Sequence, residues 1–427
     1  MADITEQSAP PNGFGRRSER RDLLGRRGLL LLVVAGLLAA VLLAGLAMRA
    51  LTEAGDTNSY TLLAEAFLNG RLDVARCIDV DCALYGGRMW VIFPPVPAVV
   101  VMPFVALFGT GFAGFVLIAA LAAAVSLWLW WRIFERLSLE RPAMVWLVLA
   151  LAFATPLYYV TIRGDGVWFF AQAIAFLLVT FAVHQVVRGG SLLLAGIAIG
   201  LAFLCRQMSL FYLPFLFALA LKTDEPLISF RWPHWRRALA LGLPVAAAVG
   251  VYFVYNYVRF GDALDTGYNY MMPSEPGDEN MVTYRLDDYG LFSSAYVLFN
   301  AMYLFVQGFH LQFSEPTWTV PGALDPAGTS LLAASPFVLL AVFAPMRRPV
   351  VIGLLMIAVM VVPMLFYHSN GFTQYNAQRY VLDWLPILFV ILAFALRKGL
   401  LPALQVLVTY AIGLNVVTMV MLALTAG

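Results

Sequence analysis

Long apolar runs recur through the chain, and they restrict its fold more than any other feature. Each run is about 17–24 residues long, enough to cross a hydrocarbon layer of roughly 30 Å as a helix. Hydrophobic residues make up 62% of the 427 residues and charged residues 12%, about half the roughly 25% of a soluble domain. One soluble core of this size is excluded, because cores stop growing near about 250–300 residues. The sequence predicts an all-α, polytopic transmembrane protein.

The N-terminal segment predicts the orientation in the membrane. Residues 1–27 are polar and carry six arginines. The apolar run 28–48 that follows is longer than the ~7–15-residue core of a cleavable signal peptide. We therefore expect a disordered, basic, cytoplasmic tail at 1–27 and a signal anchor after it. Residues 28–427 are predicted to form a single transmembrane domain.

The basic connectors extend this topology along the chain. Connectors rich in arginine and lysine are expected on the cytoplasmic side, and an alternation of about eleven spans satisfies that rule. The expected spans are 28–48, 112–131, 143–161, 167–187, 191–205, 208–221, 238–257, 329–345, 350–366, 379–396 and 400–423.

Two polar segments interrupt the apolar runs, and both are expected outside. These external loops cover about 49–111 and 258–328, and short amphipathic helices are expected in them at 61–69 and 291–313. Val91–Gly109 is apolar and long enough to span, but it contains four prolines, each of which would kink a helix interior. Counting it as a crossing would also put the basic connector after 112–131 outside. We interpret it as a re-entrant or interfacial element.

The first loop holds acids at the expected membrane surface. Asp56 follows the first span by about eight residues, close to Glu53 and Tyr60. Such a carboxylate can accept the proton of a hydroxyl group, and two acids can also hold a divalent cation. Ordinary solvated loop acids would look the same.

A second acid lies in a short external turn. Asp165 stands between two glycines, after Arg163. The glycines allow close approach of a partner, although a tight turn alone also favours Gly and Asp.

Two arginines stand in apolar surroundings on the expected outer side. Arg206 lies between leucine, cysteine and methionine, and Arg379 begins the run 379–396. A charge at membrane depth indicates a functional site with an anionic partner. An intrahelical pair of Arg379 with Asp383 is the simpler interpretation, and a fork that holds a phosphate oxygen is the functional one.

Cys77 and Cys82 share the first loop and predict a disulfide if that side is oxidising; a metal pair is the alternative, without further ligands nearby. His310, in the aromatic stretch of the second loop, is either a base or metal ligand or a structural residue. Walker, dinucleotide-binding and serine-hydrolase motifs are absent from the sequence, which gives no support to an ATP-driven pump.

Four segments carry a resemblance to a known family. They are the acid after the first span, Phe93–Pro97, Tyr255–Tyr268 and Gln378–Pro386. In their order and in the loop pattern, the chain resembles bacterial GT-C glycosyltransferases. The branch it is most similar to contains dolichyl-phosphate-mannose protein mannosyltransferases and aminoarabinose lipid A transferases.

The resemblance implies a sugar on polyprenyl phosphate as donor and a helical GT-C-like fold. It implies Asp56 as catalytic base, Asp165 as a residue that shapes the site or a metal site, and Arg206 and Arg379 near the lipid phosphate. Other residues of these motifs are expected to shape the site or meet the acceptor: Glu53, Tyr60, Arg163, Arg259, Tyr268, His310 and Tyr380. Gly-Asp-Thr replaces the paired acids of many relatives at Asp56, so metal use is left open.

The expected reaction is transfer to a glycan, lipid or protein acceptor at the outer face of the cytoplasmic membrane. Phosphate is a stable leaving group, so one base and charge-stabilising arginines suffice, and a single displacement inverts the anomeric carbon. Membrane lipids are expected partners and nucleic acid is not. A lipid-linked sugar flippase and an O-antigen-type ligase or polymerase are the alternatives.

Overall fold

The computed structural model describes residues 26–78, 82–271, 281–314, 316–371, 374–396 and 399–425. Of the expected tail 1–27, only Arg26 and Arg27 are among them. The predicted cytoplasmic connector at 397–398 also lies outside the described residues.

Six helices in the described part of the chain are long and apolar enough to cross a membrane. They are α1 (Arg26–Leu51), α4 (Phe115–Arg136), α7 (Val167–Val187), α10 (Trp232–Phe260), α14 (Arg348–Leu365) and α16 (Leu401–Thr425). The pair α5 (Arg141–Phe153) and α6 (Pro156–Ile162), bent by 47°, adds a seventh if it counts as one span. The prediction of a multi-pass helical membrane protein is confirmed.

The count of eleven spans is not confirmed, because four predicted spans fold as short or broken helices. The runs 191–205 and 208–221 become α8 (Leu192–Phe203), the 3-10 helix Gln207–Phe211 and α9 (Tyr212–Ala220). The run 329–345 becomes α13 (Leu331–Ala334) and the 3-10 helix Pro336–Phe343. The run 379–396 becomes the 3-10 helix Arg379–Asp383 and α15 (Leu385–Leu396). Proline or a charged residue stands at each break. A 12-residue helix such as α8 reaches only about 18 Å.

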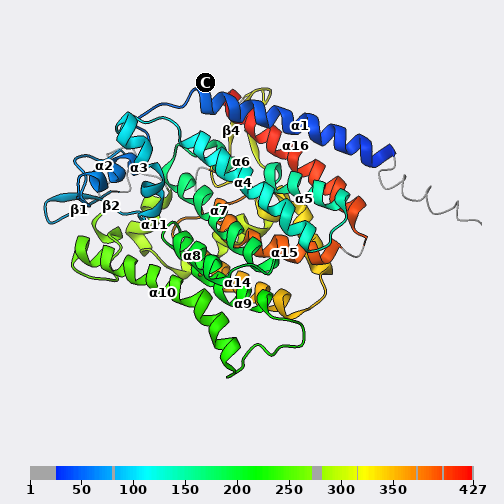
Figure 1. Cartoon of the computed structure of the whole chain (residues 1–427). Helices are drawn as coiled ribbons and strands as arrows, with labels where there is room; N and C mark the ends of the chain where they lie inside the picture. The colour runs from blue at the N-terminus through cyan, green and yellow to red at the C-terminus, as the bar shows by residue number, and fades with distance from the viewer. Residues whose placement is uncertain are drawn as a thin grey trace, which may run out of the picture.

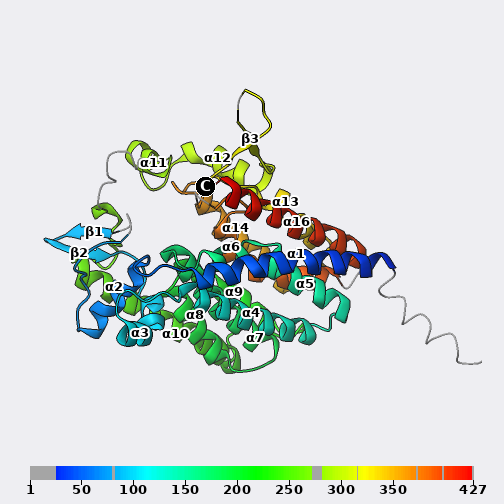
Figure 2. The same cartoon turned by 90° about the horizontal axis from the view of Figure 1, so that it is seen from above.

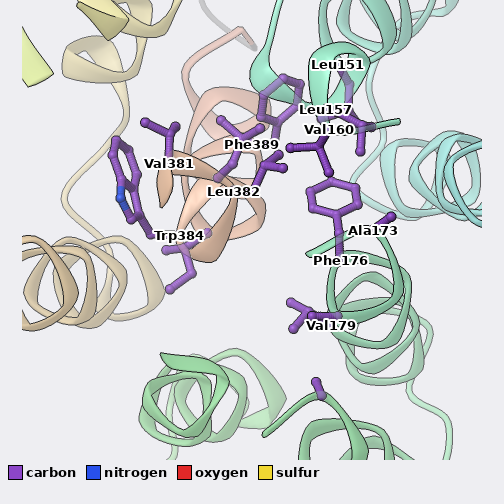
Figure 3. Close-up of a cluster of buried hydrophobic side chains, with 14 of the residues drawn as sticks. Leu151, Leu157, Val160, Ala173, Phe176, Val179, Val381, Leu382, Trp384 and Phe389 are labelled. Carbon is purple, nitrogen blue, oxygen red and sulfur yellow. The ribbon is translucent and has the colours of Figure 1, made fainter. Parts of the chain in front are cut away.

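The centre of the molecule is built around α15, whose side chains are all buried. An apolar helix without a polar face belongs in an interior. Phe389 of α15 packs between the ring of Trp130, 5.8 Å away between centroids, and that of Phe337, 6.1 Å away. Figure 3 shows this core, where α15 meets residues of α5 to α7 such as Leu157 and Phe176. At the periphery, α1 and α16 lie side by side (Figure 1).

The first large loop begins and ends at the same end of the bundle. The Glu53 carboxylate accepts hydrogen bonds from the backbone N–H groups of Phe115 and Val116 at the start of α4, at 2.8 and 2.9 Å. Gly55 lies so close to Gly111 that a Cβ on Gly55 would collide with the Gly111 carbonyl oxygen. The segment between them therefore returns to where α1 ended. This geometry agrees with an element at 91–109 that makes no net crossing.

That loop folds into α2 (Ser59–Leu68), the hairpin of β1 (Cys82–Tyr85) and β2 (Arg88–Val91), and α3 (Val96–Phe108). The helix expected at 61–69 is confirmed, capped by the Asn58 side chain, which accepts from the Tyr60 N–H at 3.0 Å. With 13 residues, α3 reaches about 20 Å, short of the hydrocarbon thickness. It packs on α2 (Figure 1).

The second loop meets the first at this end. Arg259, in the last turn of α10, donates to the Val91 carbonyl of β2 at 2.8 Å. The loop contains the 3-10 helix Tyr268–Tyr270, α11 (Met281–Tyr289), a helix from Ser294 to Val306 that includes α12 (Val297–Ala301), and the hairpin of β3 (Leu311–Phe313) and β4 (Pro321–Leu324). Figure 2 shows α11, α12 and β3 along one edge of the bundle.

One detail of the predicted fold is wrong. The helix expected at 291–313 runs from Ser294 to Val306, and the chain enters strand β3 after His310. The predicted all-α class is confirmed, since the described residues are mostly helical with two short hairpins. We name the end of the bundle that carries both loops the loop end.

Labelling of single cysteines tests the topology. With Cys205 replaced by alanine, cysteines at Thr57 and Ser369 should react with an impermeant reagent on intact cells. Cysteines at Ser138, Thr223 and Arg347 should react only after permeabilisation. Of these positions all but Ser369 are exposed, so a lack of reaction at them would report the side of the membrane. External labelling of Ser138 would contradict the assignment of 91–109. The further external position, Gly277, lies outside the described residues.

Candidate active site

The turn between α6 and α7 gathers charged residues of three segments. Asp165 is buried and pairs with the guanidinium of Arg49, from the last turn of α1. Arg163 lies 3.9 Å from the same carboxylate. The Asn58 side chain donates to the Asp165 carbonyl oxygen at 3.0 Å. Asp165 thus ties the first loop to α7 and balances two arginines.

Arg379 is the most unusual charge in the described structure. Its side chain is only 7% exposed, and its Nε and Nη1 have no hydrogen-bond partner among the described residues. Its Nη2 lies 3.5 Å from the Tyr380 hydroxyl. The guanidinium lies near the rings of Trp168 and Phe169, at 5.6 and 5.3 Å. No carboxylate in the described residues pairs with it.

The backbone around Arg379 is held firmly. Its N–H donates to Gln374 Oε1 at 2.8 Å, and its carbonyl accepts from Gln172 of α7 at 3.1 Å. A buried donor without a partner costs about 1–3 kcal/mol, so two such donors on one fixed side chain favour an anion beside them. Arg379 is therefore the best candidate for an anion-binding residue.

Arg206 finds its partner inside the protein. It forms a two-pronged ion pair with Asp383, at 2.9 Å from Nε and 2.6 Å from Nη2. Asp383 thus pairs across the fold with Arg206 rather than within its own helix with Arg379. The short 3-10 helix separates the expected pair, since its side chains follow a tighter turn than those of an α-helix.

Tyr380 links the two predicted phosphate-binding arginines. Its ring lies 5.4 Å from the Arg206 guanidinium and 4.8 Å from that of Arg379. Phe169 plays the same part between Arg379 and Arg163, at 5.3 and 5.4 Å. Arg163, Arg379 and Arg206 therefore form one row separated by aromatic rings, which we call the arginine row. Tyr268 of the second loop is partly buried and packs against the hydrophobic core.

Asp56 lies apart from this row. Its backbone adopts a left-handed conformation with φ 64°, and its half-exposed carboxylate pairs with Arg76 at 2.5 Å. Among the described residues its carboxylate pairs with Arg76 and with no arginine of the row. It lies two residues before Asn58, which bonds to the Asp165 turn. The structure therefore puts Asp56 on the solvent side of the site.

Glu53 has a structural task. It caps the start of α4, and burial raises the pKa of its carboxyl group, an effect that its two backbone N–H bonds partly offset. Glu53 therefore does not stand beside Asp56 as a metal ligand. The described residues contain no group of three or more acids, histidines or cysteines placed to hold a metal ion.

Three other predicted residues do not join the site. Arg259 is buried and uses its donors on Val91, Asn256 and Tyr255. Tyr60 packs in the core of α2, near Phe93 and Phe170. His310 is exposed before strand β3. Arg259 and Tyr60 thus stabilise the loops that carry the site.

Cys77 and Cys82 are joined as a disulfide, with Cα atoms 6.2 Å apart. The pair lies in the loop that enters strand β1, where it ties this loop to the hairpin.

Several residues of the site escaped the sequence prediction. Trp168 and Phe169 follow the Asp165 turn directly, and an aromatic pair at the start of a helix after that turn was the available signal. Gln172 lies one helical turn further on the same helix. The pairing of Arg49 with Asp165 spans 116 residues, and nothing local in the sequence indicates it.

A family model matches one segment of the chain. Residues 93–255 match the model of the family described as dolichyl-phosphate-mannose-protein mannosyltransferase. The predicted resemblance to dolichyl-phosphate-mannose protein mannosyltransferases is confirmed for this segment. The matched segment contains the Asp165 turn and Arg206, and excludes Asp56 and Arg379.

No curated protein matches the chain by sequence. Among solved structures, the chain is similar to the crystal structure of ArnT from Cupriavidus metallidurans bound to undecaprenyl phosphate. Its sequence identity is 16% and its TM-score 0.49, over 95% of this chain and 78% of that one.

The loop after α14 predicts a dependence of stability on pH. Burial lowers the pKa of His368 to about 4, with Arg285 adding to the effect. An unfolded histidine titrates near 6.5. The folded protein therefore favours the neutral form of His368. Its contribution to the free energy of unfolding is fully present above about pH 6.5. That contribution is lost as pH falls towards 4, by up to ~1.4 kcal/mol per pH unit.

Thermal unfolding of the purified protein in detergent between pH 7 and pH 5 measures this slope. His368→Asn should flatten it, whereas the same change at exposed His310 should leave it as in the native protein. An unchanged slope in His368→Asn would assign the acid sensitivity to another group.

Proposed function

We propose that the protein is a membrane glycosyltransferase that moves a sugar from a polyprenyl-phosphate donor to an acceptor at the outer face of the cytoplasmic membrane. The observation that carries this proposal is Arg379, a buried guanidinium without an anionic partner among the described residues. A phosphate oxygen accepts from such a fork in charge-assisted hydrogen bonds. The apolar surroundings favour a lipid phosphate over a hydrated ion.

The family match supports the class of donor. The family is described by a mannose carried on dolichyl phosphate and a protein acceptor. The part of this chain that matches it includes Arg163 and two of the aromatic residues near Arg379, Trp168 and Phe169. The sugar of this protein and its acceptor, a glycan, lipid or protein of the envelope, are left open.

Arg379 and Arg206 take different parts in this proposal. Arg379 binds the phosphate, since its donors are free for it among the described residues. Arg206 can reach the same phosphate only by sharing its guanidinium with Asp383. We therefore assign Arg206 mainly to holding the Tyr380 ring and the 3-10 helix in place, with a secondary contribution to the positive field.

Asp56 is the proposed general base. The acceptor oxygen attacks the anomeric carbon, its proton passes to the Asp56 carboxylate, and the bond from that carbon to the phosphate oxygen breaks. The polyprenyl phosphate leaves with the electron pair, stabilised by the arginine row. The exposed position of Asp56 suits an acceptor that arrives from the aqueous side, and Arg76 must share or release the carboxylate. A single displacement inverts the anomeric centre.

Removal of Arg379 should weaken donor binding. A hydrogen bond to a charged group is worth about 1.5–3 kcal/mol, so Arg379→Ala should lower the affinity for undecaprenyl phosphate by roughly 10–150-fold. Arg379→Lys should recover part of it, because the charge returns without the fork. Binding is measured on the protein in detergent or nanodiscs.

Arg88→Ala is the matched control, since Arg88 is an exposed arginine of the same loop end. Equal losses in Arg379→Ala and Arg88→Ala would indicate a general charge effect and contradict a phosphate site at Arg379.

Exchange of Asp56 should separate chemistry from binding. Asp56→Asn should reduce sugar transfer by ~10²–10⁴-fold while leaving binding of undecaprenyl phosphate and the unfolding temperature nearly unchanged, because an exposed ion pair contributes little to stability. Asp165→Asn should instead lower the unfolding temperature, since it leaves Arg49 and Arg163 uncompensated.

A native rate of transfer in Asp56→Asn would place the base elsewhere. A protein that moves lipid-linked sugars across the membrane without transfer would tolerate this change as well, so the same variant distinguishes a flippase from a transferase.

A further inference from the structure

A basic pocket lies at the end of the bundle opposite the loop end. It has a volume of about 300 Å³ and is lined by Trp128, Arg132, Arg136, His184 and Arg188. These residues come from the last turns of α4 and α7, which pack against each other. His184 follows Trp168, the residue beside Arg379, by sixteen residues of the same helix, which corresponds to roughly 24 Å. The pocket and the proposed active site therefore lie at opposite ends of α7.

The pocket carries an excess of positive charge. Three arginines line it, and one carboxylate, that of Glu135, compensates Arg132 at 2.6 Å. Arg188 donates only to the amide oxygen of Gln185, and Arg136 has no ion-pair partner among the described residues. All three guanidinium groups act electrostatically on the His184 ring. The Nδ1 atom of His184 is buried and has no hydrogen-bond partner in the described part of the chain.

The usual preference of arginines for helix ends does not explain why three of them surround the buried ring nitrogen of His184. Positive residues are common in cytoplasmic connectors and are favourable at helix C-termini. Such residues are normally solvated separately, and each can extend away from its neighbours. Here they converge on one concave site around a buried ring nitrogen. That arrangement suits an anion with several acceptor oxygens.

The surface of α4 that leads to the pocket identifies the kind of anion. Leu117, Leu121, Val125 and Trp128 follow one another at spacings of three and four residues and are 45–60% exposed. They form a continuous apolar stripe along one face of the helix. Arg132 and Arg136 continue the same face at spacings of four.

An acyl chain along this stripe would bring its headgroup to the arginines. Trp128 stands at the boundary, where tryptophan is enriched in membrane proteins. Basic pockets between transmembrane helices on the cytoplasmic side bind the headgroups of anionic lipids.

We propose that this pocket binds the phosphate headgroup of an anionic phospholipid of the cytoplasmic leaflet. Arg136 and Arg188 supply the charge that the headgroup neutralises, and the acyl chains lie along the stripe of α4. The site is independent of the sugar-transfer site, and its occupant is a lipid that the protein retains rather than converts. It anchors the ends of α4 and α7, the helix that carries Trp168 and Phe169 at its other end.

The experiment compares lipid retention by variants of the full chain. Protein is reconstituted in phosphatidylcholine vesicles with or without phosphatidylglycerol, extracted in mild detergent, and examined by native mass spectrometry. The wild type should retain phosphatidylglycerol over phosphatidylcholine. Arg136→Gln and Arg188→Gln should each reduce this preference about fivefold, and the double variant about 25-fold. One arginine near an anionic lipid surface changes the binding constant by about fivefold. Arg136→Lys should retain most of it.

Arg141→Gln is the matched control, because Arg141 is exposed at the start of α5 on the same side and does not line the pocket. Its retention should equal that of the wild type. Unfolding temperatures in phosphatidylcholine alone show that each variant is folded, and Arg136→Lys keeps the test valid if a neutral variant does not fold.

A second arm separates a lipid headgroup from free phosphate. Inorganic phosphate is titrated against protein in phosphatidylcholine alone. One pair of results would overturn the lipid assignment in favour of a soluble phosphate. Phosphate would stabilise the wild type but not Arg136→Gln, and the wild type would show no preference for phosphatidylglycerol. Equal retention of phosphatidylglycerol by the wild type and the double variant would overturn the site itself.

Discussion

The ion pair of Arg206 with Asp383 joins two places where the helices of this bundle are interrupted. Arg206 stands between α8 and the following 3-10 helix, and Asp383 ends the 3-10 helix before α15. A charge among apolar helices requires a partner, and each of these breaks supplies one half of the pair. The pair holds Tyr380 against Arg206, and Tyr380 in turn contacts Arg379. The position of the arginine row depends on this contact between distant segments.

Charge is distributed unequally among the arginines of the loop end. Arg206 is compensated by Asp383, Arg49 and Arg163 share Asp165, and Arg259 is enclosed by backbone and amide acceptors. Arg379 alone combines deep burial, a fixed backbone and unused donors among the described residues. A protein retains such a side chain at a considerable energetic penalty, which a bound anion offsets. The same reasoning distinguishes the basic pocket at the opposite end from ordinary solvated connectors.

The proposed chemistry divides between a buried and an exposed half. The phosphate of the sugar donor requires directional N–H groups that are shielded from water. In the proposal Arg379 supplies these groups, and the aromatic residues of α7 and Tyr380 exclude water from them. The acceptor requires access, and Asp56 lies where the first loop meets solvent. Glu53 and the close approach of Gly55 to Gly111 bring this loop back to α4. Loop geometry therefore determines how far the base lies from the phosphate site.

The sequence by itself determined the class of fold and the residue types of the site. Apolar length sets which segments can cross a membrane, and basic connectors indicate their direction, because both depend on local composition. The interpretation of 91–109 followed from proline content and parity. Arginines in apolar runs were recognisable as functional candidates because burial of a charge is costly wherever it occurs.

Only the tertiary structure decided the partners. It paired Asp383 with Arg206 over 177 residues rather than with Arg379 four residues away, and it gave Asp56 and Asp165 different arginine partners. It also showed that four apolar runs are too short or too broken to span as single helices. These outcomes depend on how distant helices pack and on which backbone breaks meet, and no local pattern encodes such contacts.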